Sequence, residues 1–300
     1  MQIGRIFTLL NPIKMKIILI GKNGQLGSEI DKQSKDRKHN IHSFGHEELD
    51  IIDSEKVKSE IDKFKPDIVI NASAFHHVPL CEEQPDQAFL INSSSLKPIA
   101  EICSKNNIKF ITYSTDYVFD GLKGSQYAED DKPNPVQIYG ISKAAGEYIA
   151  LNYSKTSVVI RSSGVYGGKQ GSRSKKGNFA LNILKQAMNE DLIEVAKEQI
   201  VNPTYSVDLA KATLELLTHK DIDGIYHLAN EGYCSWAEFA SEIVKIKNLP
   251  TKIIPVDRKG MAGNLRRPFF SALANTRAKK LGIVLPSWQD AIKRYLSSLN

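Results

Sequence analysis

The stretch KIILIGKNGQLG, residues 16–27, decides the fold class of this chain. Its first half is a continuous apolar run, which indicates a strand buried on both faces rather than on one. Gly21, Gly24 and Gly27 follow at a GxxGxxG spacing, where missing side chains let the backbone approach a pyrophosphate and a helix start offers free N–H groups. Strand, glycine loop and helix in this order predict a dinucleotide-binding turn, with a tight turn without ligand as the alternative.

Similar apolar runs recur along the chain, separated by polar segments of helix length. The further predicted strands are DIVINA at 67–72, KFITYS at 109–114, SVVIRS at 157–162 and GIYHLAN at 224–230. The segments with helical spacing of apolar residues are 88–107, 142–154 and 206–220. This alternation predicts an α/β fold with a doubly wound parallel sheet of the Rossmann type.

Beyond residue 230 the texture of the sequence changes. In CSWAEFASEIVKIKN, Ser235 can cap a helix while Glu238 reaches back from three residues later. We therefore predict a smaller, mostly helical C-terminal substrate domain. The predicted division gives 15–163 and 204–229 to the dinucleotide-binding domain, and 164–203 and 230–300 to the substrate-binding domain.

Composition narrows the class of protein. Of the 300 residues 41% are hydrophobic and 25% charged, as in ordinary globular proteins. The 40 Lys and Arg against 34 Asp and Glu give a net charge of +6, which suits anionic ligands without indicating nucleic acid. No stretch approaches the roughly 20 apolar residues that span a membrane.

The cysteines and two unusual segments carry further information. The cysteines are odd in number and widely spaced, which suggests neither a disulfide framework nor a zinc site and favours a reducing cytoplasm. Because the first strand follows Met15 directly, we expect residues 1–14 to be an extension, or translation to start at Met15. KQGSRSKKGN at 169–178 is rich in Gly, Ser and positive charge and is typical of a mobile loop.

The stretch NIHSFGHEELDI at 40–51, where a second strand is expected to end, bears on the choice of dinucleotide. An acidic residue there would bind the ribose hydroxyls and repel a 2′-phosphate, but the chain reads SFGH at 43–46. Lys22 and His46 could face a 2′-phosphate, so NADPH is the predicted cofactor. Glu47 and Glu48 keep NADH as the alternative. Asp50 and Ile51 follow, where the chain could meet the adenine.

Several motifs in a fixed order then resemble a known family. They are GKNGQLG at 21–27, NASA at 71–74, STDYVFDG at 114–121, YGISK at 139–143, RSSGVYG at 161–167 and PTYSVDLA at 203–210. In this order they resemble an extended short-chain dehydrogenase/reductase, and within that class the dTDP-4-dehydrorhamnose reductase family. CSWAEFA at 234–240, RRPFFSAL at 266–273 and LPSWQDAI at 285–292 extend the resemblance over 15–300.

The resemblance implies NAD(P)H-dependent reduction of a nucleotide-activated 4-keto-6-deoxy sugar, as in dTDP-L-rhamnose biosynthesis. It implies Thr115, Tyr139 and Lys143 as the catalytic residues, with the tyrosine phenol supplying the proton. Tyr139 and Lys143, four residues apart on a helix, share one face. A phenol with an ordinary pKa of about 10 becomes a usable acid if the neighbouring ammonium favours its ionised form. Thr115 could hold the substrate oxygen.

The predicted binding residues follow from the glycine loop and from the family motifs. For the cofactor they are Gly21, Asn23, Gly24, Gln25, Leu26, Gly27, Asp50, Ile51, Ala72, Ser73, Ala74, Tyr139 and Lys143. For the nucleotide-sugar substrate they are Thr115, Asp116, Gln199, Asn202, Thr204 and Arg267. No metal site is predicted.

The chain also departs from the family pattern. Gly164 stands where the family has a Trp in a pattern like RTSWVYG, which removes a flat apolar wall from the presumed sugar pocket. Leu80 replaces the usual Lys, and Phe270 replaces the Asn of RPxNS. The histidine pair at 76–77 with Cys81 could suggest a metal, but the ligand spacing is wrong. One of the two histidines is expected to face the pocket.

Two other functions stay open at this point. A nucleotide-sugar epimerase of the same superfamily would recycle its cofactor without consuming it. A non-catalytic binding subunit, resembling the methionine adenosyltransferase regulatory subunit, would not need Thr115, Tyr139 and Lys143 together. A homodimer is possible, and the sequence names neither the base of the nucleotide nor the sugar.

Overall fold

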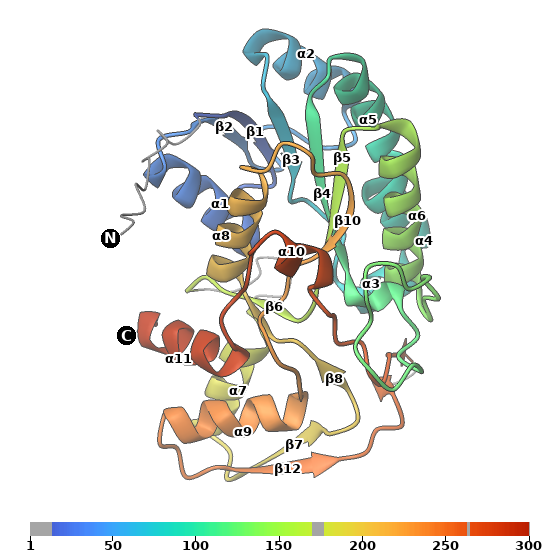
Figure 1. The fold of residues 1–300 in the computed structure, drawn as a ribbon. Coiled ribbons are helices and arrows are strands. Elements are labelled where there is room, and N and C mark those ends of the chain that lie inside the picture. The colour runs from blue at the N-terminus through green and yellow to red at the C-terminus, as the bar shows by residue number, and fades with distance from the viewer. Residues whose placement is uncertain (1–13, 170–176, 263–264, 300) are drawn as a thin grey trace, which may run out of the picture.

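The computed structural model describes residues 14–169, 177–262 and 265–299. The predicted extension, apart from Lys14, and most of the predicted mobile loop therefore lie outside the described residues. Figure 1 shows a twisted sheet between two layers of helices. A smaller group of helices and short strands lies beyond one end of the sheet's strands.

The core of the molecule is a parallel sheet of six strands in the order β10-β5-β4-β3-β1-β2. The predicted doubly wound sheet is confirmed. The order runs one way from β1 to β2 and the other way through β3, β4 and β5, so a crevice forms at the carboxyl ends near β1 and β3. The strands are β1 (Lys16–Ile20), β2 (Asn40–Phe44), β3 (Ile68–Asn71), β4 (Lys109–Thr115), β5 (Ser157–Ser162) and β10 (Gly224–His227).

Both faces of the sheet are covered, which is why the central strand β1 is almost wholly apolar, whereas the edge strand β2 is more polar and has no buried residue. Ile17 and Leu19 of β1 pack in one cluster with Leu209, whereas Ile18 and Ile20 pack in another with Ile99. The helices on the first face are α1 (Gln25–Asp36), α8 (Ser206–Leu216) and α10 (Thr276–Lys280) (Figure 1). Those on the second are α2 (Ser54–Phe64), α5 (Leu96–Lys105) and α6 (Ile138–Tyr153).

The segment 88–107 does not form the single helix that its spacing predicts. It is divided into the end of α4 (Pro85–Phe89), a π-helical turn η1 (Leu90–Ser94) and α5. The hydroxyls of Ser93 and Ser95 donate to the carbonyls of Phe89 and Ile91, at 2.6 and 2.9 Å. Such bonds from a side chain to the preceding turn bend helices, which explains the interruption.

The second group of elements has an aromatic core of its own, formed by Tyr166, Tyr205, Phe239, Trp288 and Tyr295. The predicted capping box is confirmed, with the Ser235 hydroxyl accepting from the Glu238 N–H. The helices are α7 (Phe179–Ala187), α9 (Trp236–Ile246) and α11 (Trp288–Ser298). The paired strands are β6 (Val165–Tyr166) with β9 (Thr204–Tyr205), β7 (Leu192–Ala196) with β12 (Lys252–Val256), β8 (Ile200–Val201) with β11 (Cys234–Ser235), and β13 (Met261–Ala262) with β14 (Leu265–Arg266).

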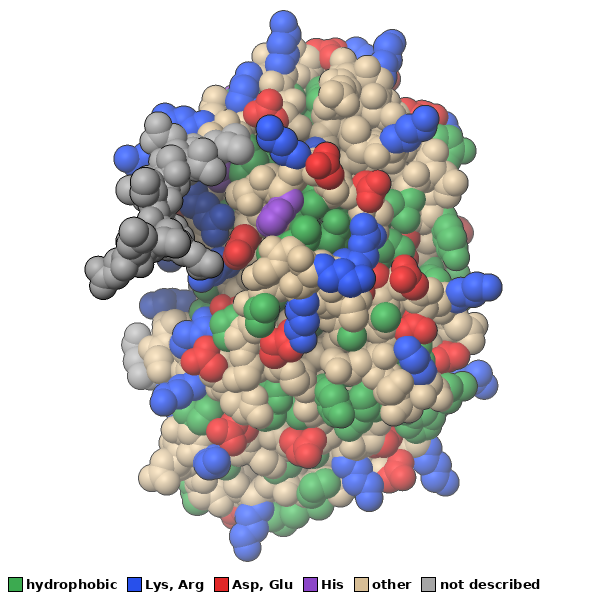
Figure 2. Space-filling model, in the orientation of Figure 1, with side chains coloured by type: hydrophobic (Ala, Val, Ile, Leu, Met, Phe, Trp, Pro, Cys, Tyr) green, Lys and Arg blue, Asp and Glu red, His purple; other side chains and the backbone are tan. Residues whose placement is uncertain are grey.

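The surface mixes charges of both signs. On the face in Figure 2, Lys and Arg are scattered among Asp and Glu rather than gathered in one band. None of the helices in the described ranges is both long and apolar enough to cross a membrane.

Two short elements follow β3 and β4. They are α3 (Val78–Glu83) and η2 (Asp116–Val118).

Candidate active site

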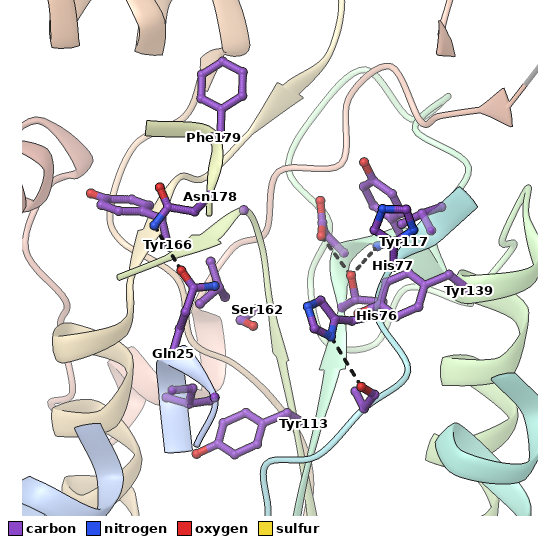
Figure 3. A pocket seen from close by; sticks show the side chains of 18 of the residues that line it. Gln25, His76, His77, Tyr113, Tyr117, Tyr139, Ser162, Tyr166, Asn178 and Phe179 are labelled. Atoms are coloured by element: carbon purple, nitrogen blue, oxygen red, sulfur yellow. Dashed lines mark hydrogen bonds between the residues drawn. The ribbon is translucent and has the colours of Figure 1, made fainter. Parts of the chain in front are cut away.

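A pocket of about 1220 Å³ lies between the carboxyl edge of the sheet and the second group of elements. Figure 3 shows its two walls. Tyr139, Tyr117 and His76 stand on the wall built by β4, α6 and the loop after β3, and Asn178 and Phe179 stand on the opposite wall at the start of α7 (Figure 3).

The glycine loop forms the floor of the pocket below β1. A Cβ on Gly21, whose φ is +93°, would lie 2.8 Å from the backbone nitrogen of Ser73. A Cβ on Gly27 would lie 2.1 Å from the Gly21 carbonyl oxygen, so this glycine allows α1 to pack on the loop. Gly24 is the N-cap of α1, and a Cβ there would make only an ordinary contact of 3.5 Å. The start of α1 thus faces the pocket with N–H groups that can bind a phosphate.

Most of the predicted cofactor-binding residues line this pocket. They are Gly21, Asn23, Gly24, Gln25, Leu26, Asp50, Ile51, Ala72, Ser73, Ala74, Tyr139 and Lys143. Gly27 is the one that lies behind the loop instead of on the pocket surface.

The charges near the end of β2 are already paired with one another. The Lys22 ammonium lies 2.6 Å from the Glu48 carboxylate, which also accepts a hydrogen bond from the Gly45 N–H at 2.6 Å. The His46 ring is exposed and lies 3.5 Å from the Asp50 carboxylate. Lys22 is therefore not a free cation for a 2′-phosphate, and a phosphate there would have to compete with Glu48.

The three predicted catalytic residues meet on one wall. Tyr139 and Lys143 come from α6, Thr115 ends β4, and all three line the pocket. Burial raises the pKa of the Tyr139 phenol well above its ordinary value, and a hydrogen bond with Thr115 offsets this only in part. Burial lowers the pKa of the Lys143 ammonium to about 8.

These shifts differ from the expectation that Lys143 lowers the pKa of the phenol. Both side chains are withdrawn from water, and loss of hydration disfavours the charged form of each. The opposing contributions to the pKa, the Thr115 hydrogen bond for Tyr139 and the Glu147 charge for Lys143, are smaller. The phenol of Tyr139 therefore keeps its proton at neutral pH. A protonated phenol is the form that a proton donor requires.

Asp116 lies beneath these residues and is only 3% exposed. Its carboxylate accepts from the hydroxyls of Thr115 at 3.1 Å and Ser163 at 3.0 Å, and from Ser271 as well. Burial raises the pKa of this carboxyl to about 6, against the lowering by the three hydroxyls. The carboxylate thereby fixes the orientation of the Thr115 side chain at the pocket.

The remaining predicted substrate residues separate into two pairs. Gln199 and Arg267 line the pocket, and the buried Nε of Arg267 has no hydrogen-bond partner among the described residues. Asn202 and Thr204 do not line it. The Asn202 amide oxygen accepts from the Leu273 N–H at 2.6 Å, and the Thr204 hydroxyl accepts from a backbone N–H at 3.3 Å, so both support neighbouring loops.

Comparison with known proteins places the chain in a family. Residues 15–300 match the sequence model of the family described as RmlD substrate binding domain. The chain belongs to this family. The resemblance predicted from the motifs is confirmed.

Relatives of the chain match it over nearly its whole length. The spore coat polysaccharide biosynthesis protein SpsK of Bacillus subtilis is 37% identical over 94% of this chain and 96% of its own. The dTDP-4-dehydrorhamnose reductase of Aggregatibacter actinomycetemcomitans is 33% identical over 93% and 97%. A crystal structure of dTDP-4-dehydrorhamnose reductase from Bacillus anthracis in complex with NADP is 29% identical, with a TM-score of 0.87 over 95% of this chain and 100% of that one.

Gly164, where the family pattern has a Trp, does not leave the pocket without an aromatic wall. The φ of Gly164 is +54°, and a Cβ there would lie 3.3 Å from Cη2 of Trp236, whose indole comes from α9. The ring centroids of Trp236 and Phe179 are 4.4 Å apart, and both residues line the pocket. Sequence analysis missed this pair because each aromatic residue fits the apolar pattern of its own helix.

The histidine pair has two separate functions in the structure. Both histidines line the pocket, where one was expected (Figure 3). His77 also caps α3 by accepting from the Leu80 N–H at 3.3 Å. Cys81 donates to the Phe75 carbonyl oxygen. Across the described ranges, no three His, Cys, Asp or Glu side chains converge as metal ligands would.

Proposed function

We propose that this protein, an NAD(P)-dependent oxidoreductase, reduces the keto group of a nucleotide-activated 4-keto-6-deoxy sugar with NADPH, with NADH as the alternative. One observation carries the proposal. Thr115, Tyr139 and Lys143 lie on one wall of the pocket whose floor is the glycine loop. A proton donor and a dinucleotide site therefore share one cavity.

The residues of the loop fit a dinucleotide. The lack of a Cβ at Gly21 and the open N-cap at Gly24 leave room for a pyrophosphate beside the first N–H groups of α1. When bound, the cofactor supplies a hydride. Its nicotinamide half would extend over β3 and β4, where Ala72–Ala74 and Lys143 line the pocket. The Lys143 ammonium would then hold the ribose hydroxyls.

The catalytic wall completes the reduction. Tyr139 would donate its phenolic proton to the carbonyl oxygen as the carbonyl carbon receives the hydride, which would give an alcohol. The Thr115 hydroxyl gives its one hydrogen to Asp116 at 3.1 Å, so it would have to turn away from Asp116 to donate a hydrogen bond to the same carbonyl oxygen. The phenol is restored by a proton from solvent.

We place the nucleotide end of the substrate toward the second group of elements. Arg267 and Gln199 are our candidates for its phosphates, because both line that end of the pocket and the Arg267 Nε has no partner among described atoms. Phe179 and Trp236 offer a flat surface there. We propose the division with 15–163 and 204–229 binding cofactor, and 164–203 and 230–300 binding substrate, although Ala278, Ile283 and Leu285 pack in the core of the cofactor-binding sheet.

Turnover of a panel of nucleotide-activated 4-keto sugars with NADPH tests the proposal. Tyr139→Phe should bind NADPH as the wild type does and lose roughly a hundred- to ten-thousandfold in turnover, the usual worth of a positioned acid. Tyr113→Phe is the matched control, because this phenol also lines the pocket but donates to the Thr213 hydroxyl at 2.9 Å. Near wild-type turnover by Tyr139→Phe would refute the proposed acid.

The same assay separates the alternatives. A reductase consumes NADPH in proportion to product, whereas an epimerase interconverts sugars without net consumption. A protein that binds NADPH and nucleotide sugar but turns over neither would instead be a binding subunit.

A further inference from the structure

Behind the catalytic wall, α6 carries a second charged residue in line with Lys143. Glu147 is one helical turn beyond Lys143, so the two side chains share a face of α6. Glu147 is 3% exposed and Lys143 is 5% exposed. Glu147 does not line the pocket, and no substrate or cofactor can reach it there.

The partner of Glu147 is equally buried. Arg161 of β5 is 1% exposed and donates from Nε and Nη2 to the two carboxylate oxygens of Glu147, at 2.8 and 2.6 Å. The Cζ of Arg161 lies 5.0 Å from the centroid of the Phe119 ring, which covers the guanidinium. The Nη1 of Arg161 lies 3.4 Å from Nε2 of His227. A buried ion pair adds little stability over apolar side chains of the same shape, so its role must be sought elsewhere.

We propose that the Glu147–Arg161 pair is the electrostatic support of Lys143, with the Glu147 carboxylate keeping the buried lysine in its charged form. The inference rests on the proposed function, in which Lys143 holds the nicotinamide ribose. Arg161 fixes the carboxylate in place, so Glu147 and Arg161 are positioning residues and touch neither substrate nor cofactor.

The surrounding charges agree with this role. Burial lowers the pKa of Lys143 to about 8, and Glu147 is the neighbour that opposes this shift. Other titratable groups line the pocket, act on Tyr139 or lie beside Arg161, and none of them is a cause of the shift in the Lys143 pKa. They are Tyr139 on α6, Asp116 and Tyr117 on η2, Cys81 on α3, His76 at the pocket, and Glu129 and His227 behind Arg161.

The test measures the NADPH dissociation constant of the whole protein across neutral and alkaline pH. The wild type should lose affinity as the pH rises through about 8, where Lys143 gives up its proton. Lys143→Met should lack this loss. Glu147→Gln should show it at a pH lower by about one unit or more, because the opposite charge is gone.

A matched control separates the effect of this pair from that of ion pairs in general. Asp208 is also a buried carboxylate with an arginine partner, Arg294 at 2.6 Å, but it lies on α8. Asp208→Asn should leave the midpoint of the pH dependence unchanged. An equal shift in Asp208→Asn, or the same midpoint in Glu147→Gln as in the wild type, would overturn the inference.

Two further measurements keep the outcome clear. If Glu147→Gln does not fold, because the Arg161 charge is left unpaired, the double variant Glu147→Gln/Arg161→Met removes both charges and should shift the midpoint in the same direction. An unchanged midpoint there overturns the inference. Turnover of the 4-keto sugar is followed in parallel. If the protein turns over the sugar but its NADPH affinity does not fall at alkaline pH, only the inference about Lys143 is overturned. If the affinity falls at alkaline pH but no sugar is turned over, only the proposed reductase activity is overturned.

Discussion

Asp116 shows how one residue couples the pocket to pH. Its carboxyl is buried under three hydroxyls, and burial raises its pKa to about 6 from an ordinary 3.8. A raised pKa means that the folded protein binds the proton more tightly than the unfolded chain does. The contribution of Asp116 to stability is therefore largest in acid and is lost as the pH rises from about 4 to about 6.

Asp116→Asn removes this titration. Relative to the variant, we expect the wild type to lose about 2 kcal/mol in the free energy of unfolding between pH 4 and pH 6. Urea denaturation at a series of pH values measures the difference. Asp62→Asn, at an exposed carboxylate paired with Lys58, keeps Asp116 and is the control, so its stability should follow the wild-type curve across this pH range. Parallel curves for wild type and Asp116→Asn would contradict the burial argument.

Gly164 is under two constraints that can be separated. Its left-handed φ of +54° costs an alanine about 1–2 kcal/mol, and its neighbours at 3.3 Å, including Trp236, would have to move. Gly164→Ala should therefore destabilise the protein more than Gly282→Ala, which has a φ of +80° but nothing within 4 Å. Thermal denaturation of the two variants compares them, and equal losses would show that Trp236 does not restrict the site.

For single residues, the sequence predicted candidate catalytic side chains better than it predicted contacts between residues that are far apart in the chain. Thr115, Tyr139 and Lys143 could be placed because motifs fix their spacing along the chain. The contact of Trp236 with Gly164 could not, because the two residues come from different elements and only the folded chain brings them together. The pKa of Tyr139 was misjudged for the same reason, since burial is a property of the fold.

The glycine loop and α1 form an element in which the glycines have different functions: Gly24 leaves room for a ligand, and Gly27 allows the helix to pack on the loop. Gly24→Val should keep the fold, because a Cβ there contacts only the Gly21 carbonyl at 3.5 Å, yet NADPH should bind at least roughly tenfold more weakly where the side chain meets the pyrophosphate. Calorimetric titration with NADPH tests this. Undiminished affinity in folded Gly24→Val would show that the pyrophosphate lies elsewhere.

Gly27→Ala is the opposite case in the same loop. Its Cβ would lie 2.1 Å from the Gly21 carbonyl oxygen, so α1 has to move away from the loop. We expect a loss of about 1–3 kcal/mol in the free energy of unfolding, the usual effect of overpacking. Urea denaturation measures it. Stability equal to the wild type would mean that the approach of α1 to Gly21 is not tight.

Elements were predictable where one local signal governed them. The continuous apolar runs gave the sheet, and Ser235 with Glu238 gave the start of α9. The interruption between α4 and α5 was not predicted, because serine hydroxyls can either face solvent or bond to the preceding turn. The bonds of Ser93 and Ser95 decide this in the folded protein.

In the whole molecule, the two groups of elements are joined at several points. The Gln25 amide oxygen, from the glycine loop, accepts from the Gly167 N–H at 3.0 Å and from the Asn178 amide at 3.1 Å (Figure 3). Near the end of the chain, Ile283 and Leu285 return to pack in the same cluster as β1. These links couple the glycine loop to the elements on the far side of the pocket.

The homodimer expected from the sequence stays a prediction.

Because the two groups of elements are linked, we expect the protein to unfold in a single cooperative transition. Calorimetry should give equal calorimetric and van't Hoff enthalpies. NADPH at about one hundred times its dissociation constant should raise the free energy of unfolding by about 2.7 kcal/mol and shift the whole transition. Two transitions, with only one shifted by NADPH, would show that the two groups of elements unfold independently.

The return of Ile283 and Leu285 to the first core also affects how the protein is made. Segments leave the ribosome in order, so the glycine loop and the central strands emerge long before the residues that close the face under β10. Until then, Leu209, Tyr226 and their apolar neighbours lack part of their cover. The nascent chain must keep this surface from aggregating until residues 283–285 have also emerged, which makes it a candidate client for chaperones during translation.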